Sequence, residues 1–275
     1  GGSSLGDVAQ SMKIHENRLY VIVNNSHKVE VFDLGDEITR SETLTLDNAS
    51  PRYFAITGTI GYLSCWNLSS ILLIDLSNLS ITDTIPVPGM PEDLILDGNS
   101  LYASIPSNSD GSTANTVVEI NTTTFEIIKS YEVINGPTNL KLMGDYLYVS
   151  GTYYNAVWDI YTGLSKIDLS TGEVTTLENG VNSTIKKDLV LVNGELYRLT
   201  TAGIAKINND LSLDMDQIIS SQPGVYSSSS DENYVYFGIT DYTAPDTVFV
   251  TDHDGNLVNE FTVGSIPGDF VSIDN

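Results

Sequence analysis

The chain has 275 residues, and its 36 acidic residues outnumber its 12 lysines and arginines to give a formal net charge of −24. This balance argues against binding to nucleic-acid backbones, which requires a positive surface, and against electrostatic adsorption to anionic membranes. Cys65 is the single cysteine, so an intramolecular disulfide and a cysteine-based metal site are excluded, and it is expected to be a buried apolar residue. No apolar run approaches the roughly 20 residues of a membrane-spanning helix.

A pair of predicted strands, 17–23 and 29–34, recurs along the whole chain. The Leu19-Tyr20 step has equivalents at Gly61-Tyr62, Leu101-Tyr102, Leu147-Tyr148, Leu196-Tyr197 and Val235-Tyr236. A polar turn rich in Asn, Asp or Gly precedes most of these steps, and an alternating run of residues precedes each turn. The repeat advances by roughly 40 to 50 residues, which is the length of a propeller blade.

These patterns predict an all-β fold, a β-propeller of four-stranded antiparallel blades in a single domain over residues 1–275. Six complete blades are expected from residue 8 to about residue 263, after a leader or loop at 1–7. Residues 264–275, through Gly268–Ile273, are expected to form the inner strand of a further, closing blade. The seven-bladed type is therefore favoured.

Three segments near the N-terminus carry a family resemblance: residues 5–12, residues 20–26 and residues 28–31. They resemble the first blade of YncE-like propellers, and more narrowly those of Bacteroidota surface lipoproteins, which are related to BtuG-type cobalamin-binding proteins. The resemblance implies a cell-surface or periplasmic location in a Gram-negative bacterium, a lipid anchor upstream of residue 1 and an outer-membrane TonB-dependent transporter as partner. It also implies three additional upstream strands that would close a seven-bladed ring.

Propeller topology predicts that the loops before the inner strands share one face, the top, with the loops between the second and third strands. Loops on a rigid scaffold commonly carry function, so the candidate ligand-binding residues are taken from this face. From the loops before the inner strands, they are Arg52, Tyr53, Glu92, Asp93, Asn139, Lys187, Tyr226 and Asp269. They are expected to form a polar and aromatic ring at the mouth of the channel, which holds either a ligand or water.

The second set of top loops adds aromatic residues. Trp66 lies in the second blade, and the fourth blade contributes Tyr153, Tyr154 and Trp158. Aromatic side chains flanked by small polar residues suit a flat ligand or a protein partner. The alternative is that Trp158 and one of the tyrosines pack the loop onto its own blade.

No catalytic residues, metal ligands or cofactors are predicted. Asp252–Asn256 resembles the start of a calcium-binding loop, but position twelve is Val263 rather than glutamate, so a hairpin turn is expected. The three histidines, His15, His27 and His253, are assigned to turns on different faces and are not expected to form one site.

The sequence therefore favours a non-enzymatic binding propeller that captures a small-molecule nutrient for the transporter, with cobalamin the ligand that the resemblance implies. One alternative is a protein–protein interaction scaffold of the cell envelope. Another is a metal-dependent hydrolase or lyase that uses Glu92, Asp93 and Asp269, although the nearby Arg52 and Lys187 oppose a cation.

Overall fold

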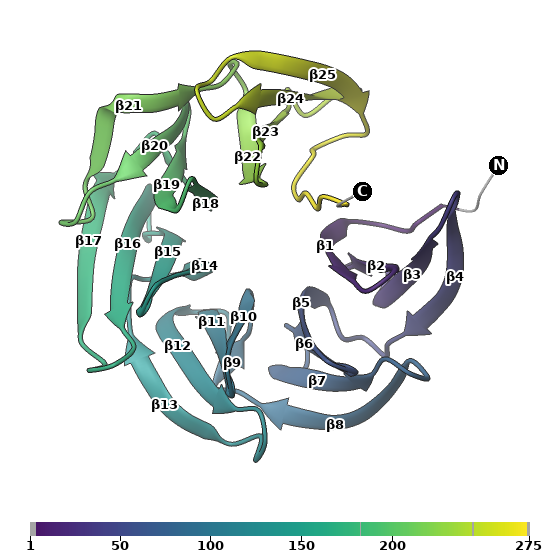
Figure 1. Cartoon of the computed structure of the whole chain (residues 1–275). Coiled ribbons are helices and arrows are strands. Elements are labelled where there is room, and N and C mark those ends of the chain that lie inside the picture. The colour runs from purple at the N-terminus through teal and green to yellow at the C-terminus, as the bar shows by residue number, and fades with distance from the viewer. Residues whose placement is uncertain (1–3, 182, 244, 274–275) are drawn as a thin grey trace. The chain divides into compact units, whose positions relative to one another are not determined.

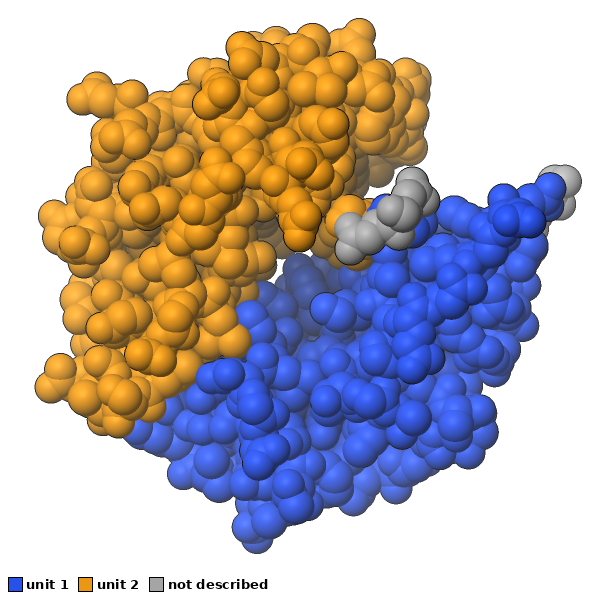
Figure 2. Space-filling view, in the orientation of Figure 1, with its two compact units in different colours: residues 1–132, 273–275 blue, residues 133–272 orange. Residues whose placement is uncertain are grey.

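The structure, a computed structural model, describes residues 4–181, 183–243 and 245–273. The chain divides into two compact units (Figure 2). Unit 1 comprises residues 1–132 together with 273–275, and unit 2 comprises residues 133–272. No helix in the described part of the chain is long and apolar enough to cross a membrane.

Unit 1 contains three blades whose strands pair in chain order (Figure 1). Blade one consists of β1 (Ala9–His15), β2 (Arg18–Val23), β3 (Lys28–Leu34) and β4 (Ile38–Thr45). Blade two consists of β5 (Pro51–Thr57), β6 (Ile60–Cys65), β7 (Ser70–Asp75) and β8 (Ser80–Pro86). Blade three consists of β10 (Leu94–Asp97), β11 (Ser100–Asn108), β12 (Thr113–Asn121) and β13 (Ile127–Glu132), with the short β9 (Gly89–Met90) also paired to β11.

Unit 2 contains three more blades with the same strand order (Figure 1). Blade four consists of β14 (Pro137–Met143), β15 (Tyr146–Tyr154), β16 (Ile160–Asp168) and β17 (Val174–Val181). Blade five consists of β18 (Ile185–Val192), β19 (Glu195–Thr200), β20 (Gly203–Ile207) and β21 (Leu213–Ser220). Blade six consists of β22 (Val225–Ser230), β23 (Tyr234–Ile239), β24 (Asp246–Asp252) and β25 (Leu257–Val263).

Tight turns connect the first and second strands of each blade, as the sequence predicts. The backbone enters the left-handed region at Glu16 before β2, at Gly98 before β11 and at Asn193 and Gly194 before β19, with φ between 51° and 77°. Glycine and asparagine tolerate this conformation, which matches the twist of the two flanking strands. The turn residues therefore fix where each blade's hairpin reverses.

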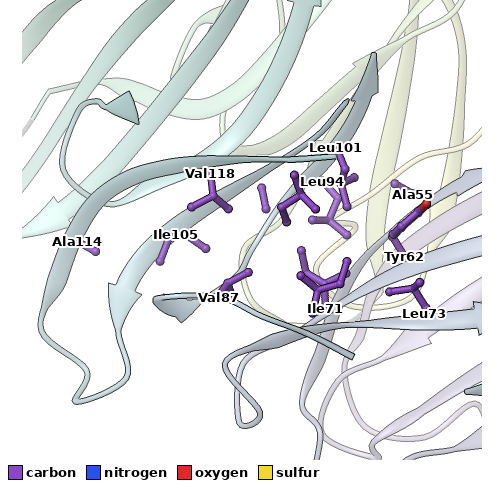
Figure 3. Close-up of a cluster of buried hydrophobic side chains, with 13 residues drawn as sticks. Ala55, Tyr62, Ile71, Leu73, Val87, Leu94, Leu101, Ile105, Ala114 and Val118 are labelled. Carbon is purple, nitrogen blue, oxygen red and sulfur yellow. The ribbon is translucent and has the colours of Figure 1, made fainter. Parts of the chain in front are cut away.

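Alternate residues of each blade pack against the neighbouring blade, as the period of two of a β-strand requires. Figure 3 shows Tyr62, Ile71 and Leu73 of blade two pointing toward Leu94 and Leu101 of blade three. None of the five side chains is more than 8% exposed. The core of unit 1 thus lies between its blades, and blade two presents one face to blade one and the other to blade three.

The face toward the preceding blade carries Leu63 and Cys65, which pack with Tyr20 and Ile22 of blade one. Cys65 is completely buried, which confirms its predicted core position. Burial raises the pKa of the Cys65 thiol to about 12, so the reactive thiolate is absent at neutral pH.

Hydrogen bonds connect neighbouring blades within each unit, close to the start of the first strand of a blade, which we call its leading strand. In unit 1, Ser11 Oγ donates to Arg52 O and Ser64 Oγ donates to Glu92 O, both at 2.6 Å. In unit 2, Leu189 N donates to Asn139 Oδ1 at 3.0 Å. These bonds hold the beginning of the leading strand, or the residue just before it, in a fixed position relative to a neighbouring blade.

The predicted seventh blade is wrong. The described residues form six four-stranded blades, and residues 264–273 form no strand. The Pro267–Phe270 segment has the sequence pattern of a leading strand. It also makes one contact typical of the start of such a strand, a hydrogen bond from Ser227 Oγ to Pro267 O. Phe270 then stacks on Tyr236 of blade six at 6.0 Å, and the segment pairs with no strand in the described part of the chain.

Candidate functional site

Arg52, Glu92 and Trp66, three of the predicted site residues, come together in unit 1. Arg52 Nε lies 2.8 Å from Glu92 Oε2 and Nη2 lies 2.7 Å from Oε1, a bidentate ion pair. Arg52 Nη1 donates to Gln10 Oε1 at 2.6 Å, and the guanidinium carbon lies 3.9 Å from the centroid of the Trp66 ring. Gln10, which the sequence analysis missed, therefore completes this polar cluster from blade one.

The Arg52–Glu92 ion pair of this cluster is satisfied on both sides. Glu92 is 3% exposed, and each of its two carboxylate oxygens already accepts a hydrogen bond from Arg52. A paired, hydrogen-bonded arginine and carboxylate are the condition under which buried charges are tolerated. Arg52 and Glu92 therefore connect the three blades of unit 1. Because both carboxylate oxygens bind Arg52, Glu92 is poorly placed to ligate a cation.

Tyr53, the third residue of β5, and Asp93, which directly precedes β10, lie next to this cluster in sequence and form hydrogen bonds through their backbones. Tyr53 N donates to Ser64 Oγ at 2.9 Å, and Asp93 N donates to Ser104 Oγ at 3.0 Å. The Asp93 carboxylate accepts the amide of Leu94 at 2.8 Å. Both side chains are half-buried, so they border the cluster.

The loop between β15 and β16 in blade four has a well-defined conformation. Asn155 Oδ1 accepts the amides of Val157 and Asp159, each at 2.9 Å, and Asn155 Nδ2 donates to Asp159 Oδ2 at 3.0 Å. Trp158 N donates to Asn155 O at 3.0 Å and has a φ of 68°. Asparagine side chains hold tight turns in this way, so one residue fixes the loop's shape.

This loop exposes three apolar side chains to solvent. Trp158 is 80% exposed, Val157 73% and Tyr154 52%. The ring centroids of Tyr154 and Trp158 lie 6.1 Å apart and the ring planes are tilted by 59°, so the two rings are neighbours but do not stack. The predicted loop aromatics Tyr154 and Trp158 thus form an exposed surface, which we call the blade-four aromatic loop together with Val157.

Tyr153 behaves differently from its neighbour. It stacks on Tyr161 across the hairpin, at 5.1 Å with 15° between the ring planes, and its hydroxyl donates to Glu178 at 2.9 Å. This is the packing alternative that the sequence left open for one of the tyrosines. Tyr153 therefore packs against the paired strand next to the loop.

The remaining predicted residues of unit 2 lie at the start of leading strands or after the last strand. Asn139 Oδ1 is occupied by the Leu189 amide, and Lys187 O accepts a hydrogen bond from Ser150 Oγ. Tyr226 makes an edge contact with Tyr242 of the β23–β24 loop at 6.3 Å, and Tyr242 is 69% exposed. Asp269 is half-buried in the segment that packs on blade six.

Two buried charged residues of blade five escaped the sequence analysis. Asp188 is 8% exposed and accepts the Ser228 amide at 2.8 Å; burial raises the pKa of its carboxyl. Arg198 is 1% exposed, and burial lowers the pKa of its guanidinium to about 9. A comparison of the repeats offered a signal for Arg198, because the other blades carry an apolar residue at the matching position.

A groove of about 460 Å³ lies at the hairpin end of unit 2 and is lined by none of the predicted site residues. Its wall includes His253, whose ring nitrogens lie 3.0 Å from Asn193 Oδ1 and 3.3 Å from Asp231 O. Asp252 nearby accepts the amides of Asp254 and Asn256, as expected for a hairpin turn. In the described residues, no three His, Cys, Asp or Glu side chains gather closely enough to hold a metal ion.

The sequence matches no protein-family model and no curated protein sequence. Several solved structures are similar in fold. A streptogramin B lyase aligns with a TM-score of 0.73 at 14% identity, over 97% of this chain and 88% of the lyase. The Kuenenia stuttgartiensis hydrazine synthase aligns with a TM-score of 0.70 at 17% identity, over 89% of this chain and 76% of that chain.

The computationally designed Ika8 protein aligns over 100% of this chain and 95% of its own length, with a TM-score of 0.67 at 10% identity. These neighbours include enzymes and a designed protein, and their identities are low, so they establish the β-propeller fold alone.

Proposed function

We propose that this protein is a non-enzymatic binding propeller that recognises its ligand through the blade-four aromatic loop. The observation that carries the proposal is the exposure of Trp158, Val157 and Tyr154 on a loop that Asn155 holds in one conformation. Exposed apolar side chains that lie together mark interaction sites, and a pre-organised loop loses little conformational entropy on binding.

The ligand class that we favour is a small-molecule nutrient with a flat, partly apolar surface, and a cobamide is the most specific candidate. The support is the resemblance of the N-terminal segments to YncE-like surface lipoproteins, related to BtuG-type cobalamin-binding proteins. In this proposal the protein acts at the cell surface or in the periplasm of a Gram-negative bacterium and passes the ligand to a TonB-dependent transporter. The aromatic rings cover apolar ligand surface, and exposed polar groups beside them bind its amides.

A protein partner is the second candidate, because tryptophan and tyrosine are the residues that most often dominate the energy of protein–protein interfaces. The aliphatic side chain of Val157 beside Trp158 fits such an interface equally well. The metal-dependent hydrolase or lyase is less well supported, since both carboxylate oxygens of Glu92 bind Arg52.

Isothermal titration with cyanocobalamin tests the favoured ligand. We expect saturable 1:1 heat from the wild type, binding weaker by about tenfold or more in Trp158→Ala, and wild-type affinity in Phe261→Ala. Phe261 is the matched control because it is 45% exposed on β25, outside the aromatic loop. An absence of heat and of thermal stabilisation at saturating cyanocobalamin would contradict the cobamide proposal.

The protein-partner alternative has its own readout. The wild type and Trp158→Ala would be used in parallel to capture proteins from an envelope extract. A protein retained by the wild type and lost with Trp158→Ala would favour the interaction scaffold, provided that cyanocobalamin gives no binding.

A further inference from the structure

Arg198 occupies a position that is apolar in the other five blades. It pairs with Leu189 of the leading strand of its blade. The residues at the corresponding position of the other blades are Val21, Leu63, Ala103, Val149 and Phe237. All five are buried core residues, and Arg198 itself is 1% exposed. Blade five therefore carries a charged side chain at a position that is part of the apolar core in the other blades.

The Arg198 side chain lies in the interface between blades four and five. Its Nη1 donates to Asn179 Oδ1 of β17 in blade four at 3.1 Å, and its Nε donates to Lys186 O at 2.8 Å. The strand pairing is irregular on both sides of this interface. Thr162 lies opposite a bulge of β17, between the Tyr161–Val181 and Gly163–Glu178 pairs, and β18 breaks register before Leu189. Such bulges are frequent beside functional sites because they redirect side chains.

Two polar groups at this interface have no hydrogen-bond partner among the described residues. One is Arg198 Nη2 and the other is Thr162 Oγ1, and both atoms are buried. Thr162 precedes Leu164 by two residues and shares its face of β16, and Leu164 packs against Leu189 and Leu196 of blade five. Thr162 therefore faces the same interface as Arg198, and its strand lies beside Asn179. Buried polar atoms of this kind normally have a partner.

No carboxylate in the described residues forms an ion pair with Arg198. The nearest acid in sequence on the leading strand, Asp188, precedes Leu189 and so faces the opposite side of the blade, where it accepts the Ser228 amide. A buried guanidinium without an opposite charge is costly, and burial accordingly lowers the pKa of Arg198. An anion in the interface would supply both the missing charge and the missing hydrogen-bond acceptor.

We propose that the interface between blades four and five binds one small oxyanion, either inorganic phosphate or the carboxylate of a small acid. Arg198 Nη2 supplies the charge and two N–H donors, and the Thr162 hydroxyl supplies a third donor. The site is separate from the blade-four aromatic loop and does not depend on the function proposed for that loop.

Thermal unfolding in low-chloride buffer with increasing phosphate, or with increasing acetate, tests the site. We expect a saturable rise in the melting temperature of the wild type with at least one of the two anions. A response to phosphate alone identifies an inorganic phosphate site, and a response to acetate identifies a carboxylate site. In Arg198→Leu, which restores the residue type of Leu63 in blade two, the apparent affinity for that anion should fall at least tenfold.

Arg18→Leu is the charge-matched control, because Arg18 is partly exposed and lies in unit 1, and its anion response should equal that of the wild type. Thr162→Val removes one donor at constant shape and should weaken the anion severalfold, which keeps the test valid if Arg198→Leu does not fold. An unsaturable response, or a rise of equal size and midpoint in the wild type and in both interface variants, would overturn the proposal.

Discussion

The Arg52 side chain shows how one residue connects three blades. It forms a bidentate ion pair with Glu92 of blade three, bonds Gln10 of blade one and stacks on Trp66 of its own blade. Because the Arg52 and Glu92 side chains are 13% and 4% exposed, solvent screens their attraction only weakly. Loss of either partner leaves a charge with no compensation.

Arg52→Ala should therefore lower the free energy of unfolding by about 3–5 kcal/mol, the usual cost of breaking a buried ion pair. Arg18→Ala is the control, since its side chain is 36% exposed and an exposed pair contributes about 0–1 kcal/mol. Urea unfolding of both variants measures the difference. Equal losses of unfolding free energy for the two substitutions would show that the buried Arg52 ion pair contributes no more to stability than an exposed pair.

Glu30 of blade one makes a pH-dependent contribution to the stability of the fold. Burial alone raises the pKa of its carboxyl, but hydrogen bonds from Lys28 and Thr43 and the charges of Lys28 and Arg40 outweigh burial and lower it. A carboxyl whose pKa is lower in the folded than in the unfolded protein stabilises the fold above its unfolded pKa, near 4.3. This contribution is lost as the pH falls through the lower, folded-state pKa.

Denaturant unfolding of the wild type and of Glu30→Gln across pH 2 to 7 should show this directly. We expect the wild type to be the more stable protein at pH 5 to 7 and the difference to shrink below about pH 4. A difference that stays constant down to pH 2 would mean that the folded-state pKa of Glu30 is not lowered.

At the scale of the element, the blade-four aromatic loop depends on Asn155. Asn155→Ala removes the acceptor of the Val157 and Asp159 amides, so hydrogen exchange at these two amides should accelerate by about tenfold. Global stability should change by less than about 1 kcal/mol, because the loop is exposed. Asn115→Ala, which removes an exposed side-chain bond to Glu132, is the control. Unchanged exchange at Val157 and Asp159 would contradict the role of Asn155.

The strands were predictable from the sequence because each blade repeats the same turn and the same alternation. The six four-stranded blades, the hairpin turns and the burial of Cys65 all follow from that repeat. The segment at 264–273 was misread for the same reason: Pro267 and Gly268 reproduce the turn before a leading strand, but a strand also needs a pairing partner.

Side-chain roles at the candidate site were less predictable, because they depend on register and on neighbouring blades. Tyr153 and Tyr154 are adjacent in sequence, yet only Tyr153 has a partner for stacking, since the hairpin register places it opposite Tyr161. Arg52 and Glu92 are 40 residues apart, so their pairing follows only once blades two and three are packed together.

At the scale of the whole molecule, the dominant electrostatic feature is the net charge of −24. Arg18, Lys28, Arg40, Arg52 and Lys206 are engaged in ion pairs with acidic residues. The excess carboxylates therefore repel one another, which destabilises a compact state at low ionic strength.

Raising the salt concentration from 10 mM to 1 M shortens the screening length from about 30 Å to about 3 Å. The melting temperature should rise by about 2–8 °C over this range, since relief of 1–2 kcal/mol of repulsion has that effect in a chain of this size. A melting temperature that is constant or falls with salt would contradict this account.

In the proposed function the ligand lies on Trp158, and the fluorescence of this residue reports whether it does. In a Trp66→Phe background Trp158 is the only tryptophan, and the phenylalanine retains an aromatic ring beside Arg52. Acrylamide should quench its emission strongly in the free protein, since the side chain is 80% exposed. Saturating cyanocobalamin, with absorbance corrected against free tryptophan, should reduce this acrylamide quenching severalfold. Saturable binding of cyanocobalamin that leaves the acrylamide quenching of Trp158 unchanged would contradict the claim.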